Sequence, residues 1–180
     1  MVAKTQSAES FPTYRCSGTI LVIEARFYDD IGDDLMAGAI EEIEAAGGRV
    51  QRLAVPGALE IPLALGQAAA AGHFAGANAK YAGAVALGCV IRGETGHYDI
   101  VCNNANHWLM DVAVKNDIAL GNAILTVETM EQAQERARGG RAGKGGDAAR
   151  ACLRMIEIRE QFRNEGASKP APRAIVGERE

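Results

Sequence analysis

Short apolar segments alternate along the chain with longer segments in which apolar residues recur at helical spacing. The short segments are rich in branched apolar residues and predict four strands, at residues 18–26, 49–55, 81–91 and 117–126. The longer segments predict five helices, at residues 29–48, 59–72, 97–116, 128–137 and 145–162. Residues 73–79 follow neither pattern and are expected to form an irregular connection.

This order of elements favours one fold class. Strands that are separated by helices cross over in the right-handed sense and become parallel. The third predicted strand, "YAGAVALGCVI", is apolar almost throughout, which is typical of a strand covered on both faces. We therefore predict an α/β fold, a three-layer α/β/α sandwich around a four-stranded parallel sheet.

Apolar stripes along the predicted helices give the side chains expected to face the core. In the first helix they are Ile31, Leu35, Ala39, Ile40 and Ile43. In the third they are Ile100, Val101, Leu109, Val112 and Ala113. In the last they are Ala149, Cys152, Leu153 and Ile156, at i, i+3, i+4 and i+7.

The composition is that of an ordinary globular protein, with 48% hydrophobic residues, 23% charged residues and a formal net charge of −4 in 180 residues. We expect one domain at 18–165, between a flexible tail at 1–17 and a disordered tail at 166–180. No basic block indicates a nucleic acid or a membrane surface as partner. The N-terminus lacks a secretory signal, and the longest apolar run is far shorter than the roughly 20 residues of a membrane helix.

The cysteines and histidines indicate neither a disulfide framework nor a metal site. The four cysteines are Cys16, Cys89, Cys102 and Cys152. None is paired at CxxC spacing, so reduced thiols in the cytoplasm are the expected state. The three histidines do not fall at metal-ligand spacings, and His73 and His107 are expected at the surface.

Unusual residues collect after three of the predicted strands. Residues 26–28 follow the first strand, 56–60 follow the second and 92–97 follow the third. Parallel sheets bind ligands beyond the carboxyl ends of their strands, so these residues predict a binding site there. Taken singly, Phe27 is either a lid aromatic or a simple surface residue. Glu60 either holds a polyol or belongs to ordinary turn chemistry.

The segment "RGETGH" (92–97) has the composition of an anion site. Gly93 and Gly96 permit close backbone approach, and free amides at the following helix N-terminus, with the Thr95 hydroxyl, can bind an anion. His97 is the candidate for proton transfer near neutral pH. The local alternative is that Thr95 only caps the helix and that His97 is an ordinary first-turn residue.

The segment "GGRAGKGG" (139–146) does not fit a nucleotide-binding P-loop. The spacing from its first glycines to Gly143 and Lys144 is too short, and Gly145 stands where the motif needs Ser or Thr. We interpret it as a hinge between two helices, with Lys144 as a possible source of positive charge. No GxGxxG follows the first strand, which argues against a dinucleotide cofactor.

Five segments together resemble the lumazine synthases (6,7-dimethyl-8-ribityllumazine synthase). They are "ARFYDD", "VPGALEIPLA", "ALGCVIRGETGHYDIVCN", "ILTVETMEQAQERA" and "GKGGDAARACL", in this order over roughly residues 18–160. The second and third are the most specific, because no general packing rule would produce both. The resemblance implies a flavodoxin-like fold. It also implies an enzyme of riboflavin biosynthesis that condenses a ribitylaminopyrimidine with 3,4-dihydroxy-2-butanone 4-phosphate, without a metal or an organic cofactor.

The resemblance also implies roles for individual residues. Those expected to bind the pyrimidine and its ribityl chain are Phe27, Gly57, Ala58, Glu60, Val90, Ile91 and Asn122. Those expected to hold the phosphate are Glu94, Thr95, Arg136 and Lys144. His97 should be the acid/base, oriented by Asp147. In this family each pocket is completed by a neighbouring subunit within a pentamer, and pentamers sometimes assemble into sixty-subunit shells.

Three departures from the family pattern leave a second hypothesis open. Asn104 stands where many members have Glu, Asn122 stands where many have an aromatic, and the connection at 73–79 is longer than in the shorter members. A flavin- or lumazine-binding carrier without turnover would be consistent with the two asparagines. A third hypothesis, a thiol-dependent hydrolase using Cys89 or Cys102 with His97, predicts inactivation by alkylating agents.

Overall fold

A computed structural model describes residues 13–167, so most of the two expected tails lies outside the described residues. The strands are β1 (Thr19–Ala25), β2 (Arg49–Val55), β3 (Gly83–Ile91) and β4 (Leu120–Val127). The helices are α1 (Asp29–Ala45), α2 (Glu60–Ala70), α3 (His97–Lys115), α4 (Met130–Ala137) and α5 (Lys144–Ala167). Each predicted strand and helix is present, and the second strand has the predicted bounds.

The sheet confirms the predicted parallel arrangement. Its strand order is β2-β1-β3-β4, and every neighbouring pair is parallel. The two central strands are the most apolar and are buried along nearly their whole length. Because all four strands run in one direction, their carboxyl ends meet at a single edge of the sheet.

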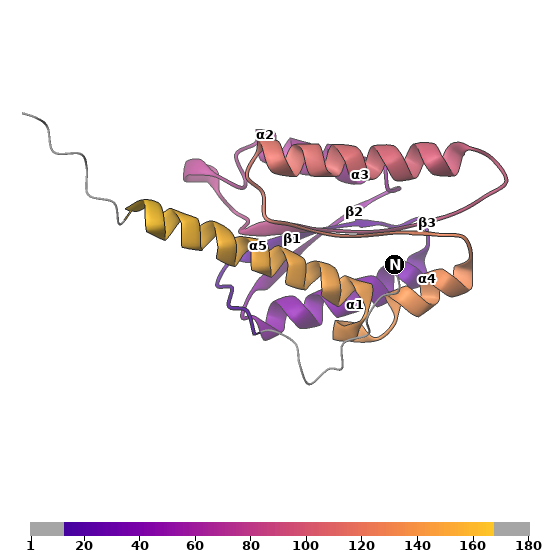
Figure 1. Cartoon of the computed structure of the whole chain (residues 1–180), viewed down its shortest axis with the longest axis horizontal. Coiled ribbons are helices and arrows are strands. Elements are labelled where there is room, and N and C mark those ends of the chain that lie inside the picture. The colour runs from indigo at the N-terminus through magenta and orange to yellow at the C-terminus, as the bar shows by residue number, and fades with distance from the viewer. Residues whose placement is uncertain (1–12, 168–180) are drawn as a thin grey trace, which may run out of the picture.

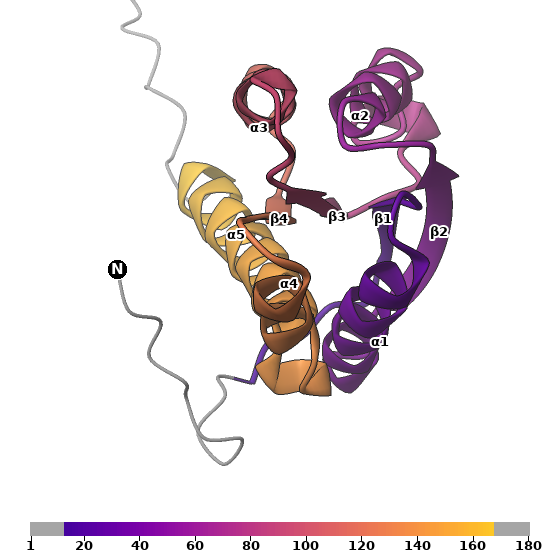
Figure 2. The same ribbon diagram turned by 90° about the vertical axis from the view of Figure 1, so that its right-hand side faces the viewer.

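Helices cover both faces of the sheet, which gives the three-layer sandwich. Helices α2 and α3 lie side by side on one face, and α1, α4 and α5 lie on the other (Figures 1 and 2). Each layer has its own apolar core, one around Leu35 and Leu153 and the other around Leu65 and Leu109. The predicted stripe of α5 is confirmed, because all four of its side chains are buried.

The predicted stripe of α3 is partly wrong. Ile100 is 56% exposed, whereas Leu109 and Ala113 are buried as expected. The buried side of α3 follows a spacing of four residues through Ala105, Leu109 and Ala113, and Ile100 lies off this line. The sequence contained an apolar residue at that position but no sign of which side of the helix the sheet would contact.

The amino-terminal boundary of the folded part lies before the predicted one. Cys16 is buried in the core beside α1, and its amide donates a hydrogen bond of 2.8 Å to the carbonyl oxygen of Ala46. Residue 16 therefore belongs to the packed structure, although it falls within the segment 1–17 that was expected to be a tail.

The glycine-rich segment 139–146 is more than a hinge. A 3₁₀ turn occupies Gly140–Ala142, and α5 already begins at Lys144. Gly139 has a φ of 102°, in the left-handed region that favours glycine. A Cβ atom on Gly145 would overlap the backbone carbonyl of Leu35 in α1. The close approach of the α1 and α5 backbones therefore requires glycine at this position. In the sequence alone, a glycine needed for close packing looks the same as a glycine that makes a flexible hinge.

Candidate functional site

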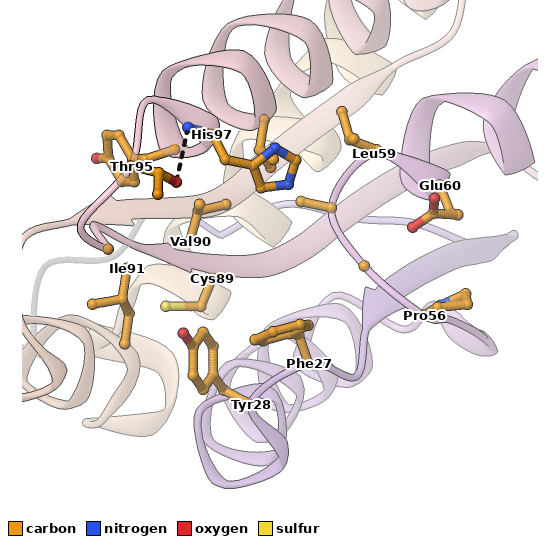
Figure 3. Close-up of a pocket in the computed structure, with 15 residues that line it drawn as sticks. Phe27, Tyr28, Pro56, Leu59, Glu60, Cys89, Val90, Ile91, Thr95 and His97 are labelled. Atoms are coloured by element: carbon orange, nitrogen blue, oxygen red, sulfur yellow. Dashed lines mark hydrogen bonds between the residues drawn. The ribbon is translucent and has the colours of Figure 1, made fainter.

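A cavity of about 430 Å³ opens at the carboxyl ends of β1, β2 and β3 (Figure 3). We call it the main pocket. Its lining residues are Phe27, Tyr28, Pro56, Gly57, Ala58, Leu59, Glu60, Cys89, Val90, Ile91, Gly93, Thr95, His97, Tyr98 and Val101. The three sequence segments that follow the first three strands thus meet around one cavity, where a parallel sheet is expected to bind its ligand.

Phe27 enters the main pocket from the loop after β1. Its ring is 70% exposed and contacts the Tyr28 ring edge-on, with 4.9 Å between the centroids. The loop is held by Arg26, whose guanidinium pairs with Asp29 at 2.8 Å and with Asp33 at 2.6 Å. The hydrogen bond to Asp33 raises the pKa of Arg26, so this anchor stays charged at any physiological pH. A fixed loop therefore presents an exposed aromatic face toward the cavity.

Glu60 places a carboxylate at the opposite end of the main pocket from Thr95 in the view of Figure 3. It is the first residue of α2, where a negative charge is favoured by the helix dipole. A Cβ atom on Gly57 would lie 3.1 Å from the Glu60 Oε2 atom. The glycine thus lets the carboxylate approach the loop backbone. The Glu60 carboxylate oxygens can accept hydrogen bonds from the hydroxyl groups of a polyhydroxyl chain that lies along this loop.

The turn before α3 carries Thr95 and His97 into the main pocket. The His97 amide donates a hydrogen bond of 3.4 Å to the Thr95 hydroxyl oxygen, drawn as a dashed line in Figure 3. No atom lies within 4 Å of a Cβ built on Gly93 or Gly96, so open space surrounds the turn. Glu94 lies in the same turn but does not line the cavity. The turn combines an open backbone, a hydroxyl and a helix N-terminus, which together can bind an anion.

The other predicted site residues line a second cavity, of about 400 Å³, along the exposed edge of β4. We call it the basic cleft. Its polar side chains are Asn122 and Thr126 from β4, Arg136 from α4, and Lys144 and Asp147 from α5. The main pocket and the basic cleft have no lining residue in common. Within one chain, the structure therefore divides the predicted site residues between two cavities, apart from Glu94, which lines neither.

Ion pairs connect the charged residues of the basic cleft. Lys144 Nζ lies 2.7 Å from Asp147 Oδ2, and Arg150 Nη2 lies 2.5 Å from Asp147 Oδ1. The expected contact of Asp147 with His97 does not form within the chain, because Asp147 faces the basic cleft and His97 faces the main pocket. The Arg136 guanidinium donates to the carbonyl oxygen of Gln132, one turn earlier in α4.

Asn122 is also fixed by its own chain. Its side-chain amide donates to Asn106 Oδ1 in α3 at 2.7 Å, and its Oδ1 atom accepts from the Ile124 amide at 2.9 Å. Its side chain is therefore held between β4 and α3 beside the basic cleft.

Tyr28 and Leu59 line the main pocket and belong to the segments that were predicted to form a binding site. Tyr98 and Val101 also line it but lie outside those segments. They follow His97 by one and four residues, so their closeness to His97 was the available signal. Helix spacing from His97 would have identified Val101, which we assigned to the core.

The two cysteines near the main pocket have the surroundings of inert thiols. Cys89 is buried in the pocket wall, and this burial raises its pKa to about 11. Burial also raises the pKa of Cys102, which is half-buried in α3. Because the thiolate is the nucleophile, these shifts disfavour the thiol-dependent hydrolase.

Residues 13–167 contain no cluster of three or more His, Cys, Asp or Glu side chains that could hold a metal ion. Over the same residues, none of the helices has the length and apolar character needed to cross a membrane.

Comparison with known proteins agrees with the resemblance in the sequence. Residues 17–160 match the family described as 6,7-dimethyl-8-ribityllumazine synthase. The protein of that name from Methylorubrum populi is 54% identical over 148 residues, which cover 82% of this chain and 86% of that protein. 6,7-Dimethyl-8-ribityllumazine synthase 1 from Rhizobium meliloti is 52% identical over 150 residues, covering 83% of this chain and 95% of that protein.

Proposed function

This chain belongs to the 6,7-dimethyl-8-ribityllumazine synthase family, and from that premise we propose how its residues divide the work of the reaction. The chain is a transferase of riboflavin biosynthesis. It condenses 5-amino-6-(ribitylamino)pyrimidinedione with 3,4-dihydroxy-2-butanone 4-phosphate and releases phosphate and water. The reaction needs two reactants in register, an anchored phosphate and a group that moves protons.

The main pocket binds the pyrimidine. Phe27 offers an exposed face on which a flat ring can stack, and the backbone of Val90 and Ile91 lies in the same wall, where it can read the ring edge. Gly57, Ala58 and Glu60 hold the ribityl chain at the end of the cavity lined by the loop after β2. This assignment is supported by the shape of the lining, in which apolar walls carry few polar groups.

The phosphate binds at the turn before α3. Thr95 and the amides at the helix N-terminus supply donors, with Glu94 contributing through its backbone. Positive charge comes from Arg136 and Lys144 in the basic cleft of a neighbouring subunit, because these residues do not line the main pocket of their own chain. The same neighbouring subunit supplies Asn122 and Asp147. Asn122 completes the pocket wall, and Asp147 orients His97.

A homo-oligomer with sites between subunits follows from this division, and the family favours a pentamer. Large apolar side chains on α2 and α3 are half-exposed or more in the single chain, as at Leu63, Trp108 and Val114. Association that covers them would remove apolar surface from water. Light scattering tests the size, since a pentamer and a sixty-subunit shell differ twelvefold in mass.

His97 moves the protons. It lies beside Thr95 in the main pocket, next to the proposed position of the phosphate-bearing substrate. Imine formation, departure of phosphate and ring closure each transfer a proton, and a positioned histidine typically accelerates such steps. Most of the acceleration comes from holding the two substrates in register, which can supply up to about 7–11 kcal/mol.

One observation supports these assignments above all others: Phe27, Glu60, Thr95 and His97, from three separate strand ends, line one cavity. A subunit-mixing experiment tests the shared site. Thr95→Ala impairs the main pocket and Arg136→Ala impairs the basic cleft. Coexpressed in equal amounts, they should regain about one quarter of the wild-type activity, since half of the pockets and half of the clefts remain intact.

If the site instead lay within one chain, the mixture would show only the mean of the two separate variants. A carrier without turnover would form no product even as the wild-type protein, which the fluorescence of the product would reveal.

The free cysteines support a cytoplasmic location. Cys16, Cys89, Cys102 and Cys152 are all unpaired among the described residues, which suits a reducing compartment.

A further inference from the structure

The turn that carries Thr95 and His97 has few bonds of its own. Over residues 93–96 of the described chain, the hydrogen bonds are the 3.4 Å bond from the His97 amide to Thr95 and a 3.2 Å bond from the Asp99 amide to Gly96. Two glycines with open space around them make this backbone easy to displace. A phosphate site built from such a turn needs an external anchor.

Arg92, directly before the turn, reaches across it. Its Nη1 and Nη2 atoms donate to the two carboxylate oxygens of Asp99, at 3.4 and 3.2 Å, in the first turn of α3. Its guanidinium carbon lies 4.0 Å from the centre of the Tyr98 ring, within the range of a cation–π contact. One side chain therefore joins the residue before the turn to the two residues that follow His97.

The same guanidinium is fixed on its other side. Nε lies 2.9 Å from a carboxylate oxygen of Glu128, which follows β4. The Arg92 amide also donates to the carbonyl oxygen of Val127 at 2.9 Å. The Glu128 amide in turn donates to Gln132 in the first turn of α4, so this end of the clamp is anchored to an ordered segment.

We propose that Arg92 is a positioning residue for the reaction, because its clamp between Asp99 and Glu128 fixes the turn that presents Thr95 and His97. The inference rests on the proposed roles of those two residues. The proposal assigns a function to the charged side chains of Arg92, Asp99 and Glu128, which do not line the main pocket.

The clamp is poorly suited to a purely stabilising role. The side chain of Arg92 is 39% exposed, and those of Asp99 and Glu128 are 59% and 57% exposed. Ion pairs this exposed contribute little to folding. Small displacements of groups that hold a substrate have much larger effects on rate. Removal of the clamp should therefore change substrate binding more than stability.

The test uses Arg92→Gln and Asp99→Asn, with Arg154→Gln as the matched control. Arg154 is an exposed arginine that pairs with Glu157 on α5, away from both cavities. We expect Arg92→Gln to raise the KM for the butanone phosphate about 5- to 10-fold. The KM for the pyrimidine should stay unchanged. The Tm should fall by less than about 4 °C, as for the control.

Asp99→Asn separates positioning from simple charge attraction. If Arg92 acted only by attracting the phosphate, removal of the Asp99 carboxylate would lower the KM for the phosphorylated substrate. Positioning predicts the opposite, a rise close to that of Arg92→Gln. The double variant should be no worse than Arg92→Gln alone, since both changes release the same contact. Arg92→Lys keeps the charge but cannot bind Asp99 through two nitrogens, so it should restore less than half of the loss.

The proposal is overturned if Arg92→Gln matches Arg154→Gln in both KM values, or if Asp99→Asn lowers the KM for the phosphate substrate. Thr95→Ala distinguishes this failure from a failure of the assigned site. If Thr95→Ala raises the KM for the butanone phosphate while the clamp variants do not, only the clamp is refuted. If Thr95→Ala has no effect either, the phosphate is bound elsewhere.

Discussion

The basic cleft and the main pocket hold their predicted site residues by different means. In the cleft, Lys144 and Asp147 form ion pairs that continue through Arg150 to the buried carboxylate of Glu42 in α1. In the pocket, Phe27 and His97 are exposed. A buried charge such as that of Glu42 needs ion-pair partners in the absence of substrate, whereas exposed rings such as those of Phe27 and His97 do not.

The difference indicates what positions the side chains in each half of the proposed shared site. Glu42 is 2% exposed and accepts hydrogen bonds from Arg141 and Arg150, so it joins α1 to the start of α5. The Lys144 and Asp147 side of the cleft is thus connected to the folded core through Arg150. The pocket instead consists of loops attached to a rigid sheet. Changes in the ion-pair network behind the cleft should therefore affect stability, whereas changes in the pocket should affect substrate binding and turnover.

The largest effect is expected from Glu42→Gln. Loss of the buried carboxylate removes one counter-charge from Arg141 and one from Arg150, which is itself 9% exposed and keeps its ion pair with Asp147. We expect the free energy of unfolding to fall by about 3 kcal/mol, and the Tm by about 6–12 °C. Denaturant unfolding at fixed protein concentration measures the change in the free energy of unfolding. Glu157→Gln, which removes an exposed partner of Arg154, should cost less than about 1 kcal/mol. Equal losses in both variants would refute the contrast between core and loops.

His97→Ala should have the next largest effect, and only on rate. A histidine in this role typically contributes 10²- to 10⁴-fold. We expect a fall in kcat of about 10²-fold or less, which equals about 2.7 kcal/mol, because an amine and a reactive ketone can condense unaided. The side chain is exposed, so the Tm should not change. A loss beyond about 10⁴-fold would show that His97 does more than transfer protons.

Arg136→Ala should weaken one substrate selectively. Loss of a charge-assisted hydrogen bond to phosphate costs about 2 kcal/mol, so we expect the KM for the butanone phosphate to rise about 30-fold. The KM for the pyrimidine should remain the same. Arg138→Ala is a suitable control, since Arg138 is exposed and pairs with Asp34 at 3.8 Å outside both cavities. An unchanged KM for the butanone phosphate in Arg136→Ala would show that the basic cleft does not bind the phosphate.

Phe27→Ala should weaken binding of the other substrate, the pyrimidine, by a smaller factor. The ring is 70% exposed and packs against Tyr28 alone among the aromatic residues described, so its loss should leave the Tm within about 2 °C. Loss of stacking costs about 1 kcal/mol, and the KM for the pyrimidine should rise about fivefold. Phe162→Ala, at an exposed position on α5, is the matched control. A rise in the KM for the butanone phosphate instead would show that Phe27 contacts that substrate and not the pyrimidine.

The pocket was more predictable from the sequence than the cleft. Strand ends are visible as the points where apolar runs stop, and a parallel sheet brings them to one edge, so Phe27, Glu60 and Thr95 could be placed together. Within the cleft, Lys144 and Asp147 pair locally along α5, but the contact that connects them to α1 is the long-range ion pair of Arg150 with Glu42. No local pattern specifies that pair.

The errors in the fold have the same origin. The strands and helices followed local periodicity, and the second strand has the predicted bounds. The exposure of Ile100 depends on which side of α3 meets the sheet, and the glycines at 139–146 depend on how closely α5 approaches α1. Both are properties of contacts between elements, which a single sequence does not display.

The smallest effect is expected from alkylation of the pocket cysteine. Burial raises the pKa of Cys89 to about 11, so only about one molecule in 10⁴ carries the reactive thiolate at pH 7. Because the pKa is raised, reactivity should stay low through neutral pH and increase only as the pH approaches 11. Iodoacetamide at pH 7 should therefore leave activity unchanged, whereas the unfolded protein should take up four equivalents, as counted by mass spectrometry. Rapid inactivation that Cys89→Ala abolishes would show that the pocket wall opens to solvent, and that its apolar lining is less rigid than the cleft.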